Sequence, residues 1–229
     1  MSKSCILLGA NSDIGRALAK LLIHDGWQVW GWARGQTLKL MPAWNLVLCA
    51  IGQVAPVGHW ADIDAREWES AVDANVLLPV RLLRELWARR EPDSAVCFLA
   101  GSNPQRVFPN YTAYATGKMA LLKAVEHMDY ESPDCKMFAL APGFVNTKIH
   151  AATHAAGVPN PRIEQFMARN DAVPIERIYG CLKWCLAQPK EVIGGRNICA
   201  SDRWEQDFLA EMLAQYPGMY KLRRYGDDK

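Results

Sequence analysis

The stretch Cys5–Gly26, CILLGANSDIGRALAKLLIHDG, carries the pattern that decides the fold. The short apolar run from Cys5 to Leu8 predicts a buried strand, and the apolar periodicity from Arg16 to Asp25 predicts a helix. Between them lies a turn bounded by Gly9 and Gly15. Backbone N–H groups and the positive end of a helix face such a turn, so this strand, turn and helix predict a cradle for a pyrophosphate.

The turn departs from the usual pattern at one position. Asp13 stands where a glycine turn of this kind has its middle glycine. A carboxylate close to phosphate groups is unfavourable, so we expect the Asp13 side chain to turn away and cap the helix that follows. The alternative interpretation is a plain strand-to-helix turn that binds nothing.

The run from Trp27 to Trp32 predicts the second strand, and Arg34 lies at its carboxyl end. An acid at this place hydrogen-bonds the adenosine ribose of a dinucleotide, whereas a cation suits a 2′-phosphate. Arg34 therefore favours NADP(H) over NAD(H). A solvated surface arginine is the alternative interpretation.

Only ten residues separate Arg34 from Asn45, where the next apolar strand begins. A strand–helix–strand unit takes about 30 residues, so no further helix and strand fit in this interval. Ten extended residues still span roughly 33 Å, which is enough to cross the face of a sheet. We therefore expect the usual third strand, an edge strand, to be absent together with its helix.

A second stretch, Ala95–Lys118, contains the candidate chemistry. Its first residues predict a buried parallel strand, and Ser102 follows at the carboxyl end, where open α/β sheets bind ligands. Tyr114 and Lys118 are four residues apart, so on a helix both point to the same face. An ammonium beside a phenol favours the phenolate, so we expect Lys118 to lower the pKa of Tyr114. The alternative is a packed ring and a solvated lysine.

Further segments predict helices and a cover for the site. The ranges 62–75 and 76–90 are helical patterns, and the second is apolar nearly all round, which predicts burial against the sheet and against another chain. The range 148–173 has mixed polarity and turn residues, so we interpret it as a mobile segment over the site. Solvated loop positions, with no metal-binding spacing, are predicted for His59, His150 and His154.

Composition limits the function classes. The 229 residues carry a net charge of +2 without a long basic run, which argues against a nucleic-acid partner. Seven scattered cysteines, with no C-x-x-C pair, predict neither a disulfide framework nor a metal site. The start resembles no signal peptide and no apolar run approaches a membrane span, so we expect a cytoplasmic protein with no membrane partner.

Taken together, these residues resemble the short-chain dehydrogenase/reductases over nearly the whole chain, to about Ser201. The resemblance rests on five features in the right order: the turn from Gly9 to Gly15, Gly52 at a strand end, Asn75, Ser102 with Tyr114 and Lys118, and the run from Pro142 through Gly143 to Thr147. Each feature is common alone, and the combination is specific.

The resemblance implies a role for each position. Tyr114 would be the general acid/base, Lys118 would lower its pKa and bind the nicotinamide ribose, Ser102 would orient the substrate oxygen, and Asn75 would hold a water behind Lys118. Cofactor contacts are implied for Gly9, Ser12, Asp13, Ile14, Gly15, Arg34, Ala50, Gly52, Tyr114, Lys118, Pro142, Gly143, Val145 and Thr147. The acid that touches adenine in the family has no counterpart, so adenine is expected near Leu38, Leu40 or Met41, or in a more exposed position.

The expected fold is a single α/β domain, 1–229, with a doubly wound Rossmann-type parallel sheet of about six strands. Residues 202–229 form a C-terminal extension that would cover the substrate mouth or lock an oligomer. The expected function is an NADP(H)-dependent carbonyl reductase or alcohol dehydrogenase acting on a small molecule. The alternative is a catalytically retired dinucleotide-binding regulatory or scaffold protein. A homodimer or homotetramer through helices 76–90 and 112–130 is implied by the resemblance.

Overall fold

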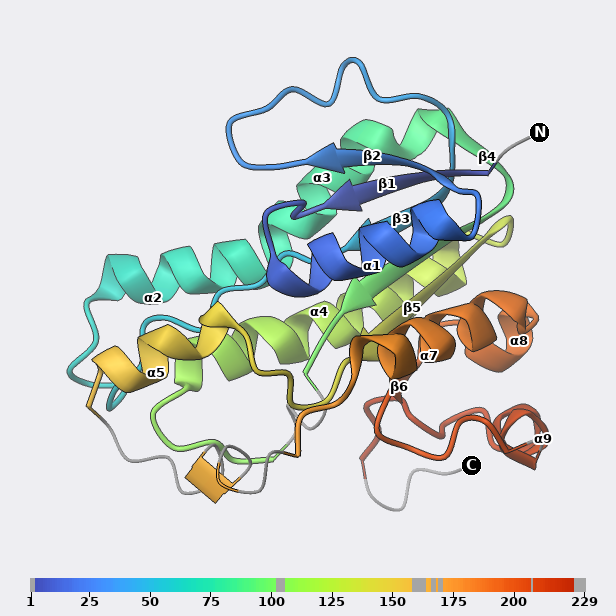
Figure 1. Ribbon diagram of the computed structural model, residues 1–229. Coiled ribbons are helices and arrows are strands. Elements are labelled where there is room, and N and C mark those ends of the chain that lie inside the picture. Colours follow the sequence, from blue (N-terminus) through green and yellow to red (C-terminus); the bar gives the residue numbers. More distant parts are fainter. Residues whose placement is uncertain are drawn as a thin grey trace.

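The computed structural model describes residues 3–101, 106–157, 164–165, 168, 171–206 and 208–224. Within these residues one sheet of six parallel strands has the order β2-β1-β3-β4-β5-β6 (Figure 1). The strands are β1 (Ser4–Leu8), β2 (Gln28–Trp32), β3 (Trp44–Cys49), β4 (Arg90–Leu99), β5 (Cys135–Ala141) and β6 (Asn197–Cys199). The register pairs Leu8 with Cys49 and Leu99 with Leu140, so the carboxyl ends of the strands meet at one edge.

The predicted loss of the third strand is confirmed. In the described residues β2 pairs with β1 alone and forms the edge of the sheet, and the chain runs on to β3 without forming another helix or strand. Trp30 in β2 is 45% exposed. It lies on the same face of the strand as Trp32.

Helices cover both faces of the sheet. One face packs against α1 (Asp13–His24), α7 (Ile175–Ala187), α8 (Lys190–Ile193) and α9 (Phe208–Gln215). The other packs against α3 (Leu78–Leu86) and α4 (Thr112–Glu131), with α2 (Ala65–Val72) against α4. The short elements η3 (Lys148–His150) and α5 (Ala151–Ala155) lie beside the carboxyl edge of the sheet (Figure 1).

The two helices predicted over 62–90 form a continuous run in the structure. Between α2 and α3 lies the π-helical turn η1 (Asp73–Leu77), and η2 (Trp87–Arg89) follows α3. Pro79 has no N–H to donate to the carbonyl of Asn75 four residues earlier, which accounts for the change of helix type here.

The prediction that residues 76–90 are apolar nearly all round is wrong. Leu82, Leu83 and Leu86 are buried, whereas Arg81 and Arg84 face solvent. The helix is therefore amphipathic, with one side on the sheet. The number of apolar residues in this range did not reveal that its arginines lie together on the exposed side of the helix.

The C-terminal extension packs on the same face of the sheet as α1 and α7. Arg196, which is 2% exposed, donates to the carbonyls of Leu213, Tyr216 and Met219. Leu209 and Leu213 join the core beneath α7. None of the described residues of the extension lines the cavity described below.

Candidate active site

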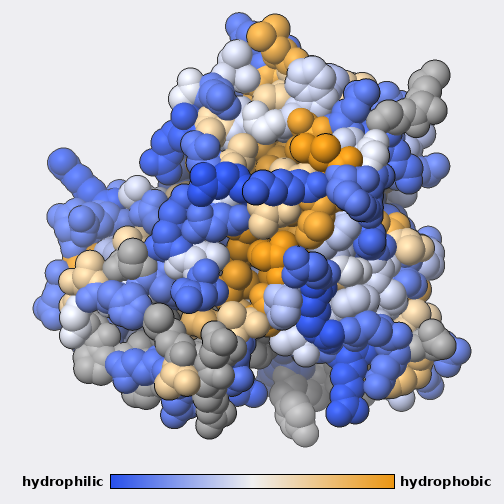
Figure 2. Space-filling model, viewed as in Figure 1, coloured by the Kyte–Doolittle hydropathy of each residue, from blue (hydrophilic) through white to orange (hydrophobic). Residues whose placement is uncertain are grey.

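A cavity of about 620 Å³ opens at the carboxyl edge of the sheet. Figure 2 shows apolar residues gathered in a hollow in the middle of one face, with hydrophilic residues around it. The cavity is lined by residues from segments far apart in the chain: the glycine turn, the ends of β2, β3 and β4, the start of α4, and the segment 142–150. Of the residues named from the sequence, it is lined by Gly9, Ser12, Asp13, Ile14, Arg34, Ala50, Gly52, Tyr114, Lys118, Pro142, Gly143, Val145 and Thr147.

The glycine turn leaves no room for side chains. Gly9 has φ +87°, and a Cβ built on it would lie 2.9 Å from the carbonyl carbon of Ala50. A Cβ on Gly15 would lie 2.5 Å from Ser12 Oγ. Gly15 lies behind the turn, where its N–H donates to Ser12 Oγ at 3.0 Å, so Ser12 is the N-cap of α1.

The Asp13 side chain turns away from the turn, as expected, but it does not cap the helix. Its carboxylate accepts from Arg16 Nη2 at 2.8 Å and from the backbone N–H of Lys148 at 3.0 Å. The Lys148 N–H and the Arg16 guanidinium hold the pKa of this carboxyl below its usual value. Asp13 therefore joins the glycine turn to a segment 135 residues away.

Arg34 is exposed at the mouth of the cavity, next to Trp32 and Ala33. The structure gives its guanidinium no hydrogen-bonding or ionic partner among the described residues. Of the two expected places for adenine, the one at Leu38, Leu40 and Met41 does not border the cavity. Leu38 is buried in the core, and Leu40 is 84% exposed.

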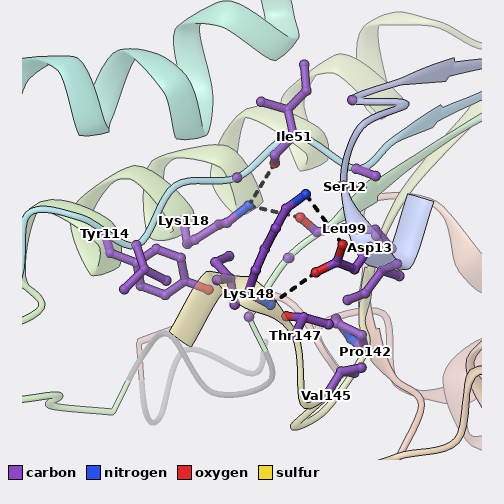
Figure 3. A pocket seen from close by; sticks show the side chains of 18 of the residues that line it. Ser12, Asp13, Ile51, Leu99, Tyr114, Lys118, Pro142, Val145, Thr147 and Lys148 are labelled. Carbon is purple, nitrogen blue, oxygen red and sulfur yellow. Dashed lines mark hydrogen bonds and ion pairs between the residues drawn. The ribbon is translucent and has the colours of Figure 1, made fainter. Parts of the chain in front are cut away.

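Lys118 lies at the bottom of the cavity and is 3% exposed. Its ammonium donates to the carbonyls of Leu99 at 3.0 Å and Ile51 at 3.4 Å (Figure 3). Both carbonyls lie at or just beyond the carboxyl ends of β3 and β4, which are neighbours in the sheet. Burial lowers the pKa of the lysine to about 8.

The Tyr114 ring lies on the same side of α4 as Lys118, as the spacing predicts (Figure 3). The expected fall in its pKa is not seen, because burial raises the pKa of the phenol to about 12. The reason is geometric: the Lys118 ammonium is held by two backbone carbonyls, and it makes no hydrogen bond to the phenol.

Asn75 is fully buried in the π-helical turn η1. Its amide donates to the carbonyls of Gln53 at 2.7 Å and Ala71 at 2.8 Å, and its Oδ1 accepts from the N–H of Gln53 at 3.2 Å. A Cβ on Gly52 would lie 3.4 Å from Lys118 Nζ and 3.6 Å from Asn75 Oδ1. Asn75 therefore lies behind Lys118 and holds the loop after β3.

Ser102 lies outside the described residues. The run after β5 is described and borders the cavity: Gly143 has φ +80°, and a Cβ there would lie 2.5 Å from Val173. This positive φ favours glycine at the position. Phe144, next along, forms a tilted ring pair with His150 at 4.9 Å.

Several cavity residues were missed by reasoning from the sequence. Phe108, Tyr111, Phe144, Lys148 and His150 form part of its wall. His150 is half-buried rather than solvated, with Nε2 at 3.2 Å from the carbonyl of Val145, and burial lowers its pKa. The Tyr111 hydroxyl donates to Thr153 Oγ1 at 2.8 Å. The aromatic residues of the segments around Phe108 and Phe144 indicated an apolar wall, but the sequence did not show which rings point into the cavity.

The described residues offer neither a membrane span nor a cluster of metal ligands. No helix there is both long and apolar enough to cross a bilayer. Within the same ranges, no group of three or more His, Cys, Asp or Glu side chains is placed to hold a metal ion.

The sequence and the fold were compared with known proteins. A family model described as enoyl-(acyl carrier protein) reductase matches residues 36–198, which is more than half of the chain. A curated oxidoreductase of Schizosaccharomyces pombe is 27% identical over 107 residues. That match covers 46% of this chain and 43% of the relative, so it spans less than half of the relative's length.

Solved structures share the fold. A small-chain dehydrogenase in complex with NADPH has a TM-score of 0.73 at 17% identity, covering 87% of this chain and 96% of that one. A short chain dehydrogenase/reductase from Saccharomyces cerevisiae has a TM-score of 0.76 at 18% identity, covering 90% and 99%. With the family match over residues 36–198, the chain belongs to the short-chain dehydrogenase/reductases, a family of NAD(P)-dependent oxidoreductases.

Proposed function

We propose that the protein is an NADP(H)-dependent carbonyl reductase or alcohol dehydrogenase, with Tyr114 as its general acid/base. The observation that carries this proposal is the cavity, where a phenol, a buried lysine and a glycine turn meet from separate parts of the chain. Lys118 and Asn75 hold the strand ends beneath it.

The cavity walls fit a dinucleotide. The backbone at Gly9 and Gly15 is packed so closely that a Cβ at either would collide. The turn leads into the N-terminus of α1, and a helix N-terminus suits a pyrophosphate. The unpaired Arg34 guanidinium suits a 2′-phosphate, which supports NADP(H) over NAD(H). The NADPH held by one similar structure is consistent with this choice.

The proposed chemistry divides between cofactor and chain. When bound, the nicotinamide supplies or accepts the hydride. Tyr114, with a pKa of about 12, keeps its proton at neutral pH and can donate it to a carbonyl oxygen that gains negative charge. Lys118 uses two of its three N–H donors on Leu99 and Ile51, which leaves one for a ribose hydroxyl.

The substrate end of the cavity is apolar and aromatic. Phe108, Tyr111 and Phe144 line it, and the Tyr111 hydroxyl is already bonded to Thr153. Burial favours the neutral form of His150. A neutral carbonyl compound with an apolar or aromatic body suits these walls better than a small acid does.

The proton-transfer role is tested by Tyr114→Phe in NADPH-dependent reduction of a panel of apolar aldehydes and ketones. Loss of a general acid lowers kcat by about 10²–10⁴-fold. Tyr130→Phe is the matched control, because Tyr130 is on the same helix and 89% exposed. A Tyr114→Phe enzyme that kept most of its activity would reject the role.

Cofactor binding is tested separately by fluorescence titration of NADPH and NADH. Arg34→Gln is expected to weaken NADPH binding about tenfold and to leave NADH nearly unchanged, because a single charged contact is lost. If the wild-type protein bound NADPH but exchanged no hydride with any carbonyl or alcohol tested, the retired regulatory alternative would be supported instead.

A further inference from the structure

The side chain of Lys148 reaches from η3 across the cavity to the glycine turn (Figure 3). Its ammonium donates to the carbonyl of Asn11 at 2.8 Å and lies 3.4 Å from Asp13 Oδ1. The backbone N–H of the same residue donates to Asp13 Oδ2 at 3.0 Å. Lys148, Asn11 and Asp13 all line the cavity.

The contacts of Lys148 compensate the negative charge that Asp13 brings to the glycine turn. A carboxylate at this position of the turn would repel a pyrophosphate that the turn otherwise suits. Here two cations, Arg16 and Lys148, face the one carboxylate. The net charge of the cluster is therefore positive, although an acid has taken the place of a glycine.

Lys148 also retains the capacity to bind an anion. An ammonium has three N–H donors, and the contacts to Asn11 and Asp13 account for two of them. The side chain is 62% exposed, so its third donor is accessible from the cavity mouth.

We infer that Lys148 is a cofactor-binding residue whose ammonium contacts the pyrophosphate and cancels the charge of Asp13, so that the two residues act as a pair. This inference rests on the proposed function, because it assigns a contact to the same dinucleotide. The inference goes beyond the proposed function because it predicts that the effect of Lys148 on cofactor affinity depends on Asp13, and the reverse.

The test is a double-mutant cycle on the dissociation constant for NADPH, measured by fluorescence titration with wild type, Lys148→Met, Asp13→Asn and the double variant. Lys148→Met is expected to weaken binding about 10- to 100-fold, since it removes a charged contact and leaves Asp13 uncompensated. In the Asp13→Asn background the same substitution is expected to cost less than tenfold. Asn keeps the acceptor for the Lys148 N–H without the charge.

Matched variants separate this role from a general effect of charge or folding. Lys20→Met removes one exposed positive charge farther along α1 and is expected to leave the affinity within twofold. Lys148→Arg is expected to restore most of the affinity. Lys148→Met is also expected to flatten the dependence of affinity on salt concentration, because fewer charges meet the phosphates. Equal thermal unfolding curves show that the variants are folded.

Each outcome bears on the inference. An unchanged affinity in Lys148→Met, or equal losses in both backgrounds, overturns it while NADPH binding by the wild type preserves the proposed function. Tighter binding in Lys148→Met also overturns it, since Lys148 would then obstruct the site. Failure of the wild type to bind either dinucleotide overturns the proposed function and this inference together.

Discussion

Replacing Lys118 by Met tests the electrostatics at the bottom of the cavity. Burial lowers the pKa of Lys118 from 10.5 to about 8. Below pH 8 the folded protein therefore carries a charged group that the unfolded chain solvates better, and between pH 8 and pH 10.5 the unfolded chain binds the proton that the folded protein has released. The free energy of unfolding thus rises with pH over this window, by about 2 kcal/mol between pH 7 and pH 9.5.

The assay is urea unfolding at a series of pH values between 7 and 9.5, for wild type and Lys118→Met. Other groups titrate in this range, so the relevant quantity is the difference between the two proteins. The stability of Lys118→Met relative to wild type is expected to fall by about 2 kcal/mol as the pH rises, because only wild type gains from deprotonation. Lys20→Met, at an exposed position in α1, is the control. A difference that stays constant with pH would show that the amine is not perturbed by burial.

Three further predictions concern other parts of the chain. Gly15→Ala is expected to lower the affinity for NADPH at least tenfold in a titration, because the new Cβ would lie 2.5 Å from Ser12 Oγ and deform the turn. Arg196→Met, which removes three carbonyl contacts of the C-terminal extension, is expected to cost about 2–4 kcal/mol in urea unfolding; a loss below 1 kcal/mol would contradict this. Sedimentation at micromolar concentration is expected to show a dimer or tetramer formed through 76–90 and 112–130, and a monomer alone would refute it.

The sheet was predictable because its signals are local. Each strand is a short apolar run ended by a turn, and the interval between Arg34 and Asn45 is too short for another strand and helix. Helix type was not predictable at η1, because it depends on how the missing N–H of Pro79 is accommodated. The exposed side of α3 was also not predicted, because the many leucines of this helix made it look apolar on all sides.

The sequence predicted most of the residues that line the candidate site, but not their pKa values or their ionic partners. The spacing of Tyr114 and Lys118 places them on one side of α4, and this follows from helix geometry. The pKa of Tyr114 depends instead on where the lysine ammonium goes, and it goes to carbonyls 19 and 67 residues away in the chain. One of the two partners of Asp13, Lys148, is likewise remote in sequence. Such contacts between residues remote in sequence depend on how the strand ends pack, and a local sequence pattern cannot predict them.

The missing edge strand has a consequence for binding. Without that strand and its helix, the end of the cavity that we propose for adenosine is bordered by Trp32, Ala33 and an exposed Arg34, while Phe108, Tyr111 and Phe144 also line the cavity. An open end contributes little buried apolar area to affinity. If the proposed function holds, we expect more of the binding free energy to come from charged contacts to the phosphates, at Arg34 and at the glycine turn. The ion pair between Lys148 and Asp13 lies at that turn, where an added cation has the largest effect.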